Sequence, residues 1–212
     1  MTTDLAARLG NEEGRLGGGA EKAAVLLDST PYPWPWDARF DPRRCALLII
    51  EPVEPALPAT ASEWAVIGEL ADQVSRAGGL VVQVQCARPP RFSKPTPAVT
   101  TPIAARFGAT VACAASGWDA FFETPLDTVL RSAGRDLLLL AGGWLEVGVH
   151  STMRSANDRG YECLLVPTAC IAIDEVTRAA TISSTEMSGG IFGAVAGPSG
   201  LSTLFTDPAG SY

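Results

Sequence analysis

Apolar runs of strand length alternate along this chain with stretches in which apolar residues recur at helical spacing. The strand-length runs cover residues 45–50, 80–85, 137–141, 161–166 and 189–196. Most of them are continuous rather than alternating, which is typical of strands that are covered by helices on both faces. Strands that alternate with helices predict an α/β protein, a three-layer α/β/α sandwich around a mainly parallel sheet.

Four helices are predicted between these strands. Thr60 and Glu63 have the spacing of a capping box, so a helix is expected from there to the Gly78-Gly79 pair. The segment Thr124-Pro125-Leu126-Asp127 predicts a second helix, with proline at its first position, that ends near Gly134. The last helix is expected over residues 174–184.

The central stretch, residues 136–160, predicts a strand, a tight turn at Gly142-Gly143, and a helix from Leu145 to Asp158 that stops at Gly160. Gly148 falls in the first turn of that helix. A glycine there costs about 1 kcal/mol relative to alanine, which indicates a close approach by another group. A helix N-terminus beyond a parallel strand is also where open α/β proteins bind ligands.

Residues 1–30 are rich in glycine and charge, and we interpret them as an N-terminal arm in front of one domain, residues 31–212. Trp34 and Trp36 follow on a proline-rich extended segment and are expected to lie against a surface. Residues 86–116 are interpreted as a long connection, either functional or part of an interface. Arm and connection together predict an oligomer in which they lie across a neighbouring subunit.

Composition sets limits on function. With 47% hydrophobic and 18% charged residues, the chain buries a core of its own. Its net charge of -7 argues against nucleic acid and anionic membranes as partners. We expect a cytoplasmic protein with five reduced cysteines, because they form no C-x-x-C pair and the N-terminus has no signal-like segment. One histidine makes a zinc site improbable, and no metal or cofactor is expected.

Several segments in order resemble the isochorismatase-like superfamily, whose cysteine hydrolases cleave small amides and ureido compounds. They are the lead-in YPWPWD at 32–37, the strand ALLIIEP at 46–52, DAFFETPLD at 119–127, the central stretch 141–159, and GGIFG at 189–193. The lead-in is most similar to biuret and ureidoacrylate hydrolase relatives. The resemblance covers about residues 31–205 and implies a six-stranded sheet.

The resemblance also implies where catalytic residues would lie. Active relatives use an aspartate that ends the first strand, a lysine, and a cysteine nucleophile in the first turn of the central helix. These positions carry Glu51, Ala115 and Gly148 here. Isochorismatases proper also have glycine at the cysteine position and act by protonation, but they keep the aspartate and the lysine. Relatives tend to have a cis peptide bond at the position of Gly143-Trp144.

Other residues receive weaker assignments. We expect Gly143, Trp144, Gly148 and Trp118 to contact a ligand. His150, on the central helix, is either catalytic or a structural hydrogen-bonding residue. Cys113 and Cys170 are candidates for a displaced nucleophile, although nothing in the sequence lowers their pKa values. Arg88 or Lys94 in the long connection would replace the missing lysine, or they are simply solvated.

Two hypotheses follow for function. In the first, the chain is a non-catalytic or accessory subunit that keeps a small-molecule pocket, as a homo-oligomer or as a heteromer with an active paralogue. In the second, Glu51 is a general acid-base on a small carbonyl, ureido or enol-ether substrate, without a covalent thioester step. A cation within hydrogen-bonding reach of Glu51 would favour the second.

Overall fold

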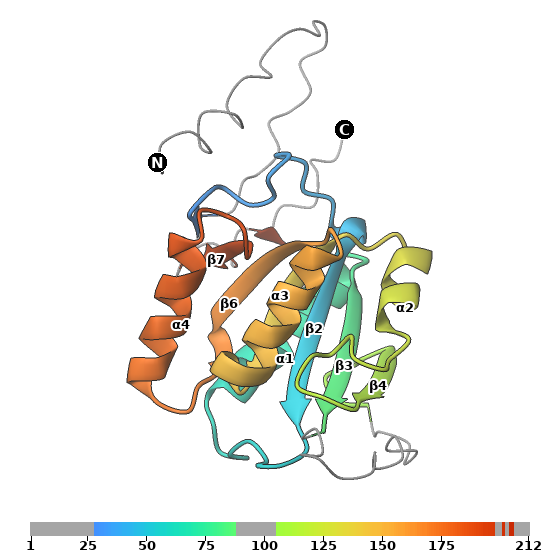
Figure 1. Ribbon diagram of the computed structural model, residues 1–212. Coiled ribbons are helices and arrows are strands. Elements are labelled where there is room, and N and C mark those ends of the chain that lie inside the picture. The colour runs from blue at the N-terminus through green and yellow to red at the C-terminus, as the bar shows by residue number, and fades with distance from the viewer. Residues whose placement is uncertain (1–27, 88–104, 198–200, 202–203, 206–212) are drawn as a thin grey trace, which may run out of the picture.

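The fold is a sheet of seven strands between two layers of helices, seen in a computed structural model that describes residues 28–87, 105–197, 201, 204 and 205 (Figure 1). The strand order is β1-β7-β6-β5-β2-β3-β4. All neighbouring pairs are parallel except β1 with β7, which is antiparallel. The strands are β1 (Ser29–Thr30), β2 (Cys45–Pro52), β3 (Leu80–Cys86), β4 (Val111–Ala115), β5 (Leu137–Gly143), β6 (Glu162–Ile171) and β7 (Ala194–Ala196).

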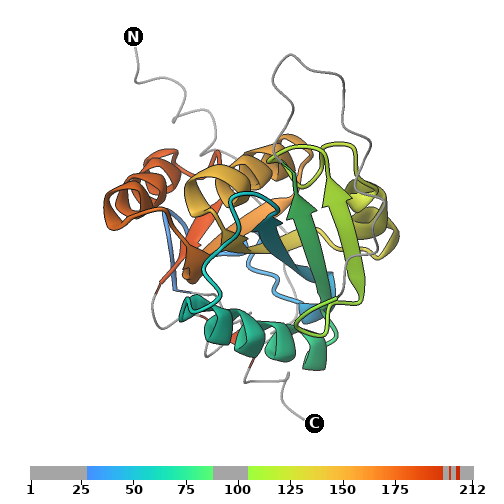
Figure 2. The same cartoon turned by 90° about the horizontal axis from the view of Figure 1, so that it is seen from below.

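Helices cover both faces of this sheet. Figure 2 shows α1 (Glu63–Arg76) alone on one face, with the other helices on the opposite face. That second layer holds α2 (Leu126–Ser132), α3 (His150–Asp158) and α4 (Glu175–Met187). A 3-10 turn, η1 (Pro42–Arg44), precedes β2, and a π-helical turn, η2 (Leu145–Val149), leads into α3. The predicted three-layer α/β architecture is therefore confirmed.

Strand β2 contributes residues to the hydrophobic cores on both faces of the sheet. Its residues are buried throughout. Ala46, Leu48 and Ile50 belong to the core beneath α2 and α3. Cys45, Leu47 and Ile49 belong to the core beneath α1. Because successive strand residues point to opposite faces, a continuous apolar run is what a doubly covered strand requires.

The predicted number of strands was wrong, since the sheet has seven rather than six. The additional strand is β1, which pairs Ser29 with Ala196 and Thr30 with Val195. These two residues were assigned to the arm, because a two-residue strand has no recognisable pattern. Strand β4 was also missed as an element, since it lies in the stretch interpreted as connection. Its sequence, VACAA, is short and rich in alanine, which weakens any strand signal.

The observed starts of α1 and α2 both differ from the predicted ones. Helix α1 begins at Glu63 with Ser62 as N-cap, so the capping box from Thr60 to Glu63 was wrong. A turn in which the Ala61 amide donates to the Pro58 carbonyl separates Thr60 from the helix. Helix α2 begins at Leu126, one residue later than expected.

The start of α2 is nevertheless capped by the threonine of the predicted motif. Pro125 is the N-cap residue of α2, and the Thr124 hydroxyl accepts a bond from the Leu126 amide at 3.3 Å. Helix α2 ends just before Gly134, which has a φ of +66°. The left-handed stop was therefore placed correctly.

The two tryptophans of the lead-in have different environments. Trp34 is fully buried and belongs to the core beneath α1. Trp36 is 69% exposed and meets Tyr32 edge-on, with ring centroids 4.6 Å apart. The expectation of a covering surface thus holds for Trp34 and fails within the described chain for Trp36. Most of the arm and most of the long connection lie outside the described residues.

Candidate functional site

The carboxyl ends of β2, β3, β4 and β5 lie at one edge of the sheet, at the bottom of Figure 1. Glu51 is the next-to-last residue of β2, and its side chain is 11% exposed. It follows Leu47 and Ile49 in the strand alternation, so it points to the face that α1 covers. The predicted placement of a carboxylate at the ligand edge of the sheet is the observed one.

Both carboxylate oxygens of Glu51 have partners. Oε1 accepts a hydrogen bond from Nε2 of Gln83 at 3.1 Å, and Oε2 forms an ion pair with Nη1 of Arg106 at 3.2 Å. The amide oxygen of the buried Gln83 accepts from the backbone N–H of Arg106 at 2.8 Å. Gln83 therefore links the strand carboxylate to the segment that carries the cation, and fixes both.

Aromatic rings hold the guanidinium of Arg106. Its Cζ lies 4.7 Å from the ring centroids of both Trp64 and Phe107, which stack on each other with centroids 5.8 Å apart. Cation–π contacts of this kind favour one orientation of the group. The Arg106 side chain remains 47% exposed, so a visiting molecule can still reach it.

Burial dominates the protonation of Glu51. Desolvation raises the pKa of its carboxyl above the usual value, and the attraction and hydrogen bond of Arg106, followed by the bond from Gln83, only partly offset this. The charged carboxylate is thus less favoured here than in water. Such a group is a functional-site candidate, because structural carboxylates are more often exposed.

A cavity of about 270 Å³ adjoins this carboxylate. It is small for a ligand pocket, since those of drug-sized molecules begin at about 300 Å³. The lining combines one acid, one base, an indole and aliphatic groups from the loop after β2: Glu51, Pro52, Val53, Ala56, Leu57, Trp64, Gln85 and Arg106.

Gly148 lies on the other side of the sheet. A Cβ built on it would be 3.0 Å from Cγ2 of Ile50, 3.4 Å from the carbonyl oxygen of Gly143 and 3.7 Å from that of Trp118. Ile50 precedes Glu51 and points to the α3 face. The close approach predicted from this glycine is real, and the described groups that make it belong to the protein's own core.

Gly143 and Trp144 lie at the end of β5, between Gly148 and the loop that follows β2. The peptide bond between them is cis, as expected. The indole N–H of Trp144 donates to the carbonyl of Pro55 at 3.2 Å, and a Cβ on Gly143 would lie 2.8 Å from Cδ2 of the cavity residue Leu57. Trp144 thus contacts the loop after β2 and is not among the residues that line the cavity beside Glu51. The expected ligand contacts of Gly143, Trp144, Gly148 and Trp118 stay predictions.

Ala115 ends β4, pairs with Cys86 of β3, and is buried in the core beneath α2 and α3. It has no charge to offer Glu51, and Arg106 supplies one instead. Sequence reasoning missed Arg106 and considered Arg88 and Lys94, which lie outside the described residues. The signal that could have found it is Gln83, because a glutamine inside a buried apolar run requires polar partners.

No cysteine offers an activated thiol. All five are free and none is exposed. Burial raises the pKa of Cys113 to about 11 and that of Cys86, with smaller contributions from nearby Asp119 and Cys113, to about 12. Burial also raises the pKa values of Cys45, Cys163 and Cys170. A displaced nucleophile at Cys113 or Cys170 is therefore unsupported, because the thiolate is the reactive form.

His150 has a structural environment. Its Nε2 lies 3.4 Å from Nε of Arg154, and its ring meets Phe192 edge-on at 6.0 Å. Burial and then the charge of Arg154 lower the pKa of the imidazole. The neutral ring acts as acceptor, which agrees with the structural alternative. Within the described residues, no group of His, Cys, Asp and Glu side chains could hold a metal ion, and no helix could span a membrane.

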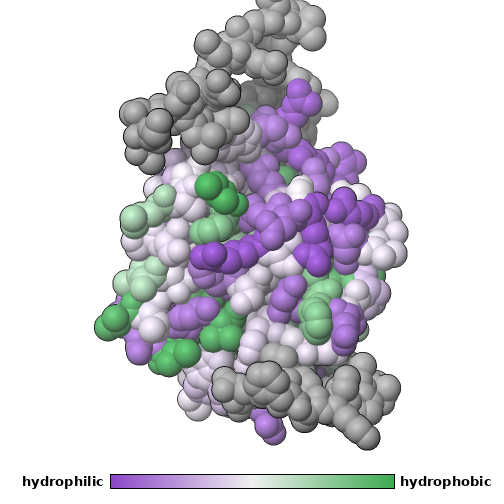
Figure 3. Space-filling view, viewed as in Figure 1, coloured by the Kyte–Doolittle hydropathy of each residue, from purple (hydrophilic) through white to green (hydrophobic). Residues whose placement is uncertain are grey.

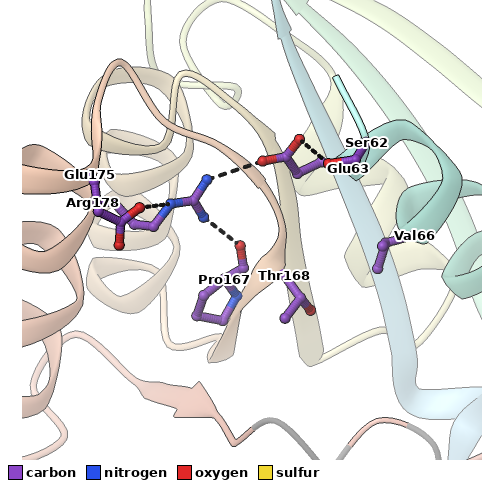
Figure 4. A pocket seen from close by; sticks show the side chains of 7 residues that line it. All are labelled: Ser62, Glu63, Val66, Pro167, Thr168, Glu175 and Arg178. Atoms are coloured by element: carbon purple, nitrogen blue, oxygen red, sulfur yellow. Dashed lines mark hydrogen bonds and ion pairs between the residues drawn. The ribbon is translucent and has the colours of Figure 1, made fainter. Parts of the chain in front are cut away.

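A second cavity, of about 440 Å³, lies between the N-termini of α1 and α4 and is shown in Figure 4. The Arg178 side chain joins its walls. It donates to the Pro167 carbonyl at 2.9 Å and pairs with Glu63 at 3.1 Å and Glu175 at 3.4 Å. Two carboxylates balance one guanidinium here, so we interpret this contact as a structural junction.

The Isochorismatase domain matches residues 46–196. The chain belongs to the isochorismatase family. A curated relative, the uncharacterized isochorismatase family protein YwoC of Bacillus subtilis (strain 168), is 37% identical over 65 residues, which are 31% of this chain and 34% of that protein. The chain spans about a third of the length of the curated relatives that it matches.

Solved structures support the same fold. An isochorismatase family protein from Burkholderia thailandensis matches with a TM-score of 0.59 and 20% identity, over 81% of this chain and 94% of that one. A nicotinamidase from Staphylococcus aureus matches with a TM-score of 0.56 and 16% identity, over 72% and 98%. At these identities the similarity establishes the isochorismatase-family fold.

Proposed function

We propose that this isochorismatase-family protein is a non-catalytic or accessory member that binds a small molecule beside Glu51. The observation that carries the proposal is that the buried Glu51 carboxylate pairs with the half-exposed Arg106, and that no activated thiol lies beside this pair among the described residues. Amide hydrolysis by the cysteine hydrolases that this chain resembles requires a thiolate with a base and a compensating cation close to it. By the resemblance to active relatives, Gly148 stands at the position of their nucleophilic cysteine. It packs against Ile50, on the sheet face opposite the one to which Glu51 points.

The pair nevertheless has the chemistry of a binding site. Glu51 accepts hydrogen bonds, Arg106 donates them, and Trp64 supplies a flat apolar wall. Amide and ureido groups are planar and carry donors beside acceptors, so they complement such a pair. The likeness of the lead-in to biuret and ureidoacrylate hydrolases, and the nicotinamidases among the solved neighbours, point to the same compounds.

One observation favours a second candidate, an altered hydrolase or lyase in which Glu51 is the general acid-base. The Arg106 guanidinium lies 3.2 Å from the carboxylate and takes the place of the missing lysine. Burial also raises the pKa of Glu51, which favours the protonated form that a general acid needs. Small carbonyl, ureido and enol-ether compounds are the substrates to consider.

Binding is tested by calorimetry on the full chain with nicotinamide, biuret, urea derivatives and small enol ethers. We expect at least one compound to bind without being consumed. Arg106→Gln should weaken its binding at least about tenfold, since a hydrogen bond to a charged group contributes roughly 1.5–3 kcal/mol. Arg76→Gln is the matched control, because Arg76 forms an exposed ion pair within α1. The absence of any binding, or an equal loss in the control, contradicts the proposal.

Turnover separates the two candidates. If the wild type forms product and Glu51→Gln abolishes this activity, the protein is the altered enzyme and not the binding protein. The rate would then fall as the pH rises through the raised pKa of Glu51, because a general acid must be protonated. Activity that resists iodoacetamide would agree with the lack of a catalytic thiol.

A further inference from the structure

A third cavity, of about 420 Å³, lies at the amino ends of β2 and β5, at the top of Figure 1. Its volume is within the range of about 300–1,000 Å³ that ligand pockets have. The charged groups of its lining are Arg44, Arg131, Arg135 and Asp136, and Tyr161 is part of the wall. Three guanidinium groups against one carboxylate give this lining an excess of positive charge, on a chain whose net charge is -7.

The elements around this cavity place it far from the Glu51 site. Arg44 directly precedes β2 and Asp136 directly precedes β5, whereas Glu51 is at the carboxyl end of β2. At about 3.3 Å per strand residue, β2 separates Arg44 from Glu51 by roughly 23 Å. The lining also includes Gly134 and Gly160, which follow α2 and α3. Figure 3 shows hydrophilic residues gathered over this end of the two helices, at the upper right of the view.

Two of the three arginines are paired with carboxylates. Arg44 donates from Nε and Nη2 to Asp136 at 2.9 and 2.8 Å, and its Nη1 has two further acceptors. Arg131 donates from Nε to Asp127 at 3.0 Å and from Nη2 to the Arg159 carbonyl at 2.8 Å. The charge of Asp136 is therefore balanced by Arg44, and Nη1 of Arg131 has no acceptor among the described residues.

Arg135 has no carboxylate partner within the described ranges. Its Nη1 donates to the backbone carbonyls of Arg43 and Gly78, which precede β2 and β3. These two bonds fix the position of the guanidinium. Its Nε is buried, and neither Nε nor Nη2 has a hydrogen-bond partner in the part of the chain that the structure describes. Because a buried donor without a partner is unfavourable, this cation is suited to an acceptor that the described chain does not supply.

We propose that this cavity binds a phosphate dianion, as the free anion or as the phosphate group of a small molecule, through Arg135 and Arg131. A guanidinium group has parallel N–H donors that fit two oxygens of one oxyanion. The oxygens of a tetrahedral phosphate point in several directions, so a phosphate can contact both arginines, whereas a planar carboxylate fits one. The volume of the cavity leaves room for an organic group beside the phosphate.

A purely structural role accounts for only part of this arrangement. The bond from Nη2 of Arg131 satisfies a carbonyl at the end of α3, as basic side chains near helix C-termini often do. The bonds from Nη1 of Arg135 hold two loops together. Neither role uses the buried Nε of Arg135, since buried donors in folded proteins almost always have an acceptor. The phosphate site and the proposed function at Glu51 can each be correct without the other.

Calorimetry on the full chain at pH 8 and low ionic strength tests the site, with inorganic phosphate, phenyl phosphate and benzoate as probes. We expect saturable binding of one phosphate compound per chain, and weaker binding of benzoate. Tighter binding of phenyl phosphate than of inorganic phosphate assigns the site to a phosphorylated small molecule. Equal affinities assign it to the free anion.

Variants connect this binding to the cavity. Arg135→Gln and Arg131→Gln should each weaken phosphate binding at least about tenfold, because each removes donors to a charged group. Arg154→Gln is the matched control, since Arg154 is exposed, lies over the Phe192 ring and has no carboxylate partner among the described residues. Arg106→Gln should also leave the affinity unchanged. Circular dichroism shows whether each variant is folded, and Arg131→Gln decides if Arg135→Gln is not.

Four outcomes contradict the proposal. The first is that neither phosphate compound shows saturable binding, and the second is that benzoate binds more tightly than phenyl phosphate. The third is that folded Arg131→Gln binds phosphate as the wild type does. The fourth is an equal loss in Arg154→Gln, which indicates attraction by charge alone, or in Arg106→Gln, which places the anion beside Glu51 instead.

Discussion

Gly148 lies where a side chain would press against the protein's own core rather than against open space. A Cβ would sit 3.0 Å from Cγ2 of Ile50, and the opposing carbonyl of Gly143 belongs to the backbone of β5. The glycine in the first turn of the helical segment is therefore explained by packing.

We predict that Gly148→Ala lowers the free energy of unfolding by about 1 kcal/mol. Overpacking costs roughly 1–3 kcal/mol, and the better helix propensity of alanine returns about 1 kcal/mol. Urea denaturation measures the change. Combined with Ile50→Ala, which removes the opposing methyl group, the alanine should cease to destabilise. A Gly148→Ala variant more stable than the wild type would show that the core gives way freely.

Glu51 and Arg106 show which part of a site the sequence can predict. Glu51 was identifiable because a carboxylate ended an apolar strand. Arg106 was not, because its contact depends on how the residues just before β4 meet β3, where the Arg106 amide donates to the Gln83 side chain at 2.8 Å and the Thr110 amide donates to the Val81 carbonyl at 3.1 Å. The sequence pattern around Arg106 does not indicate this contact with β3.

At the scale of elements, two helix N-termini offer a comparison. Asp174 caps α4, where its side chain accepts from the Thr177 amide at 2.8 Å and the Thr177 hydroxyl accepts in turn from the Asp174 amide at 3.3 Å. Ser62 is the N-cap residue of α1, yet its side chain makes no capping bond in the structure described. The N-cap residue thus forms a capping hydrogen bond in α4 and none in α1.

We predict that Asp174→Ala lowers the free energy of unfolding by about 1 kcal/mol, whereas Ser62→Ala changes it by less than about 0.5 kcal/mol. The reason is that only Asp174 satisfies amides of the first turn. Urea denaturation of both variants under one set of conditions gives the comparison. Equal losses would mean that the Asp174 hydrogen bonds contribute nothing beyond those of a solvated turn.

Long elements with a clear apolar pattern were predictable from the sequence, and short ones were not. The leucine run of β5 and the glycine after α3 placed the central strand and the end of the helix correctly, including the left-handed Gly160 at φ +82°. The turn predicted at Gly142-Gly143 was wrong, because both glycines are the last residues of β5. The π-helical turn of η2 was not foreseen, since its residues have ordinary helical spacing. Strands β1 and β4 depend on neighbours distant in sequence, and their own residues favour no structure strongly.

Across the whole molecule, the thiols are uniformly protected. None of the five is exposed, and burial raises the pKa of every one. We predict that Ellman's reagent at pH 8 labels fewer than one thiol per folded chain within minutes and all five after unfolding in guanidinium, because the reactive species is the thiolate.

A variant with an added surface cysteine, Ala65→Cys, provides the positive control for this labelling. Cys113 should be the first native thiol to react, as it is the only described cysteine that is not fully buried. Fast stoichiometric labelling of the folded wild type would reveal an activated thiol and revive the displaced nucleophile.

The strand order has a consequence for how the chain is made. Strands β2 and β3, which come early in the sequence, are inserted between β5 and β4, which come later. The ribosome releases β2 and β3 before their outer neighbours, β5 and β4, have been synthesised. The early half of the nascent chain therefore has exposed strand edges. The sheet should therefore close only after Gly143 has left the exit tunnel, and until then the unpaired edges of β2 and β3 can pair with other chains.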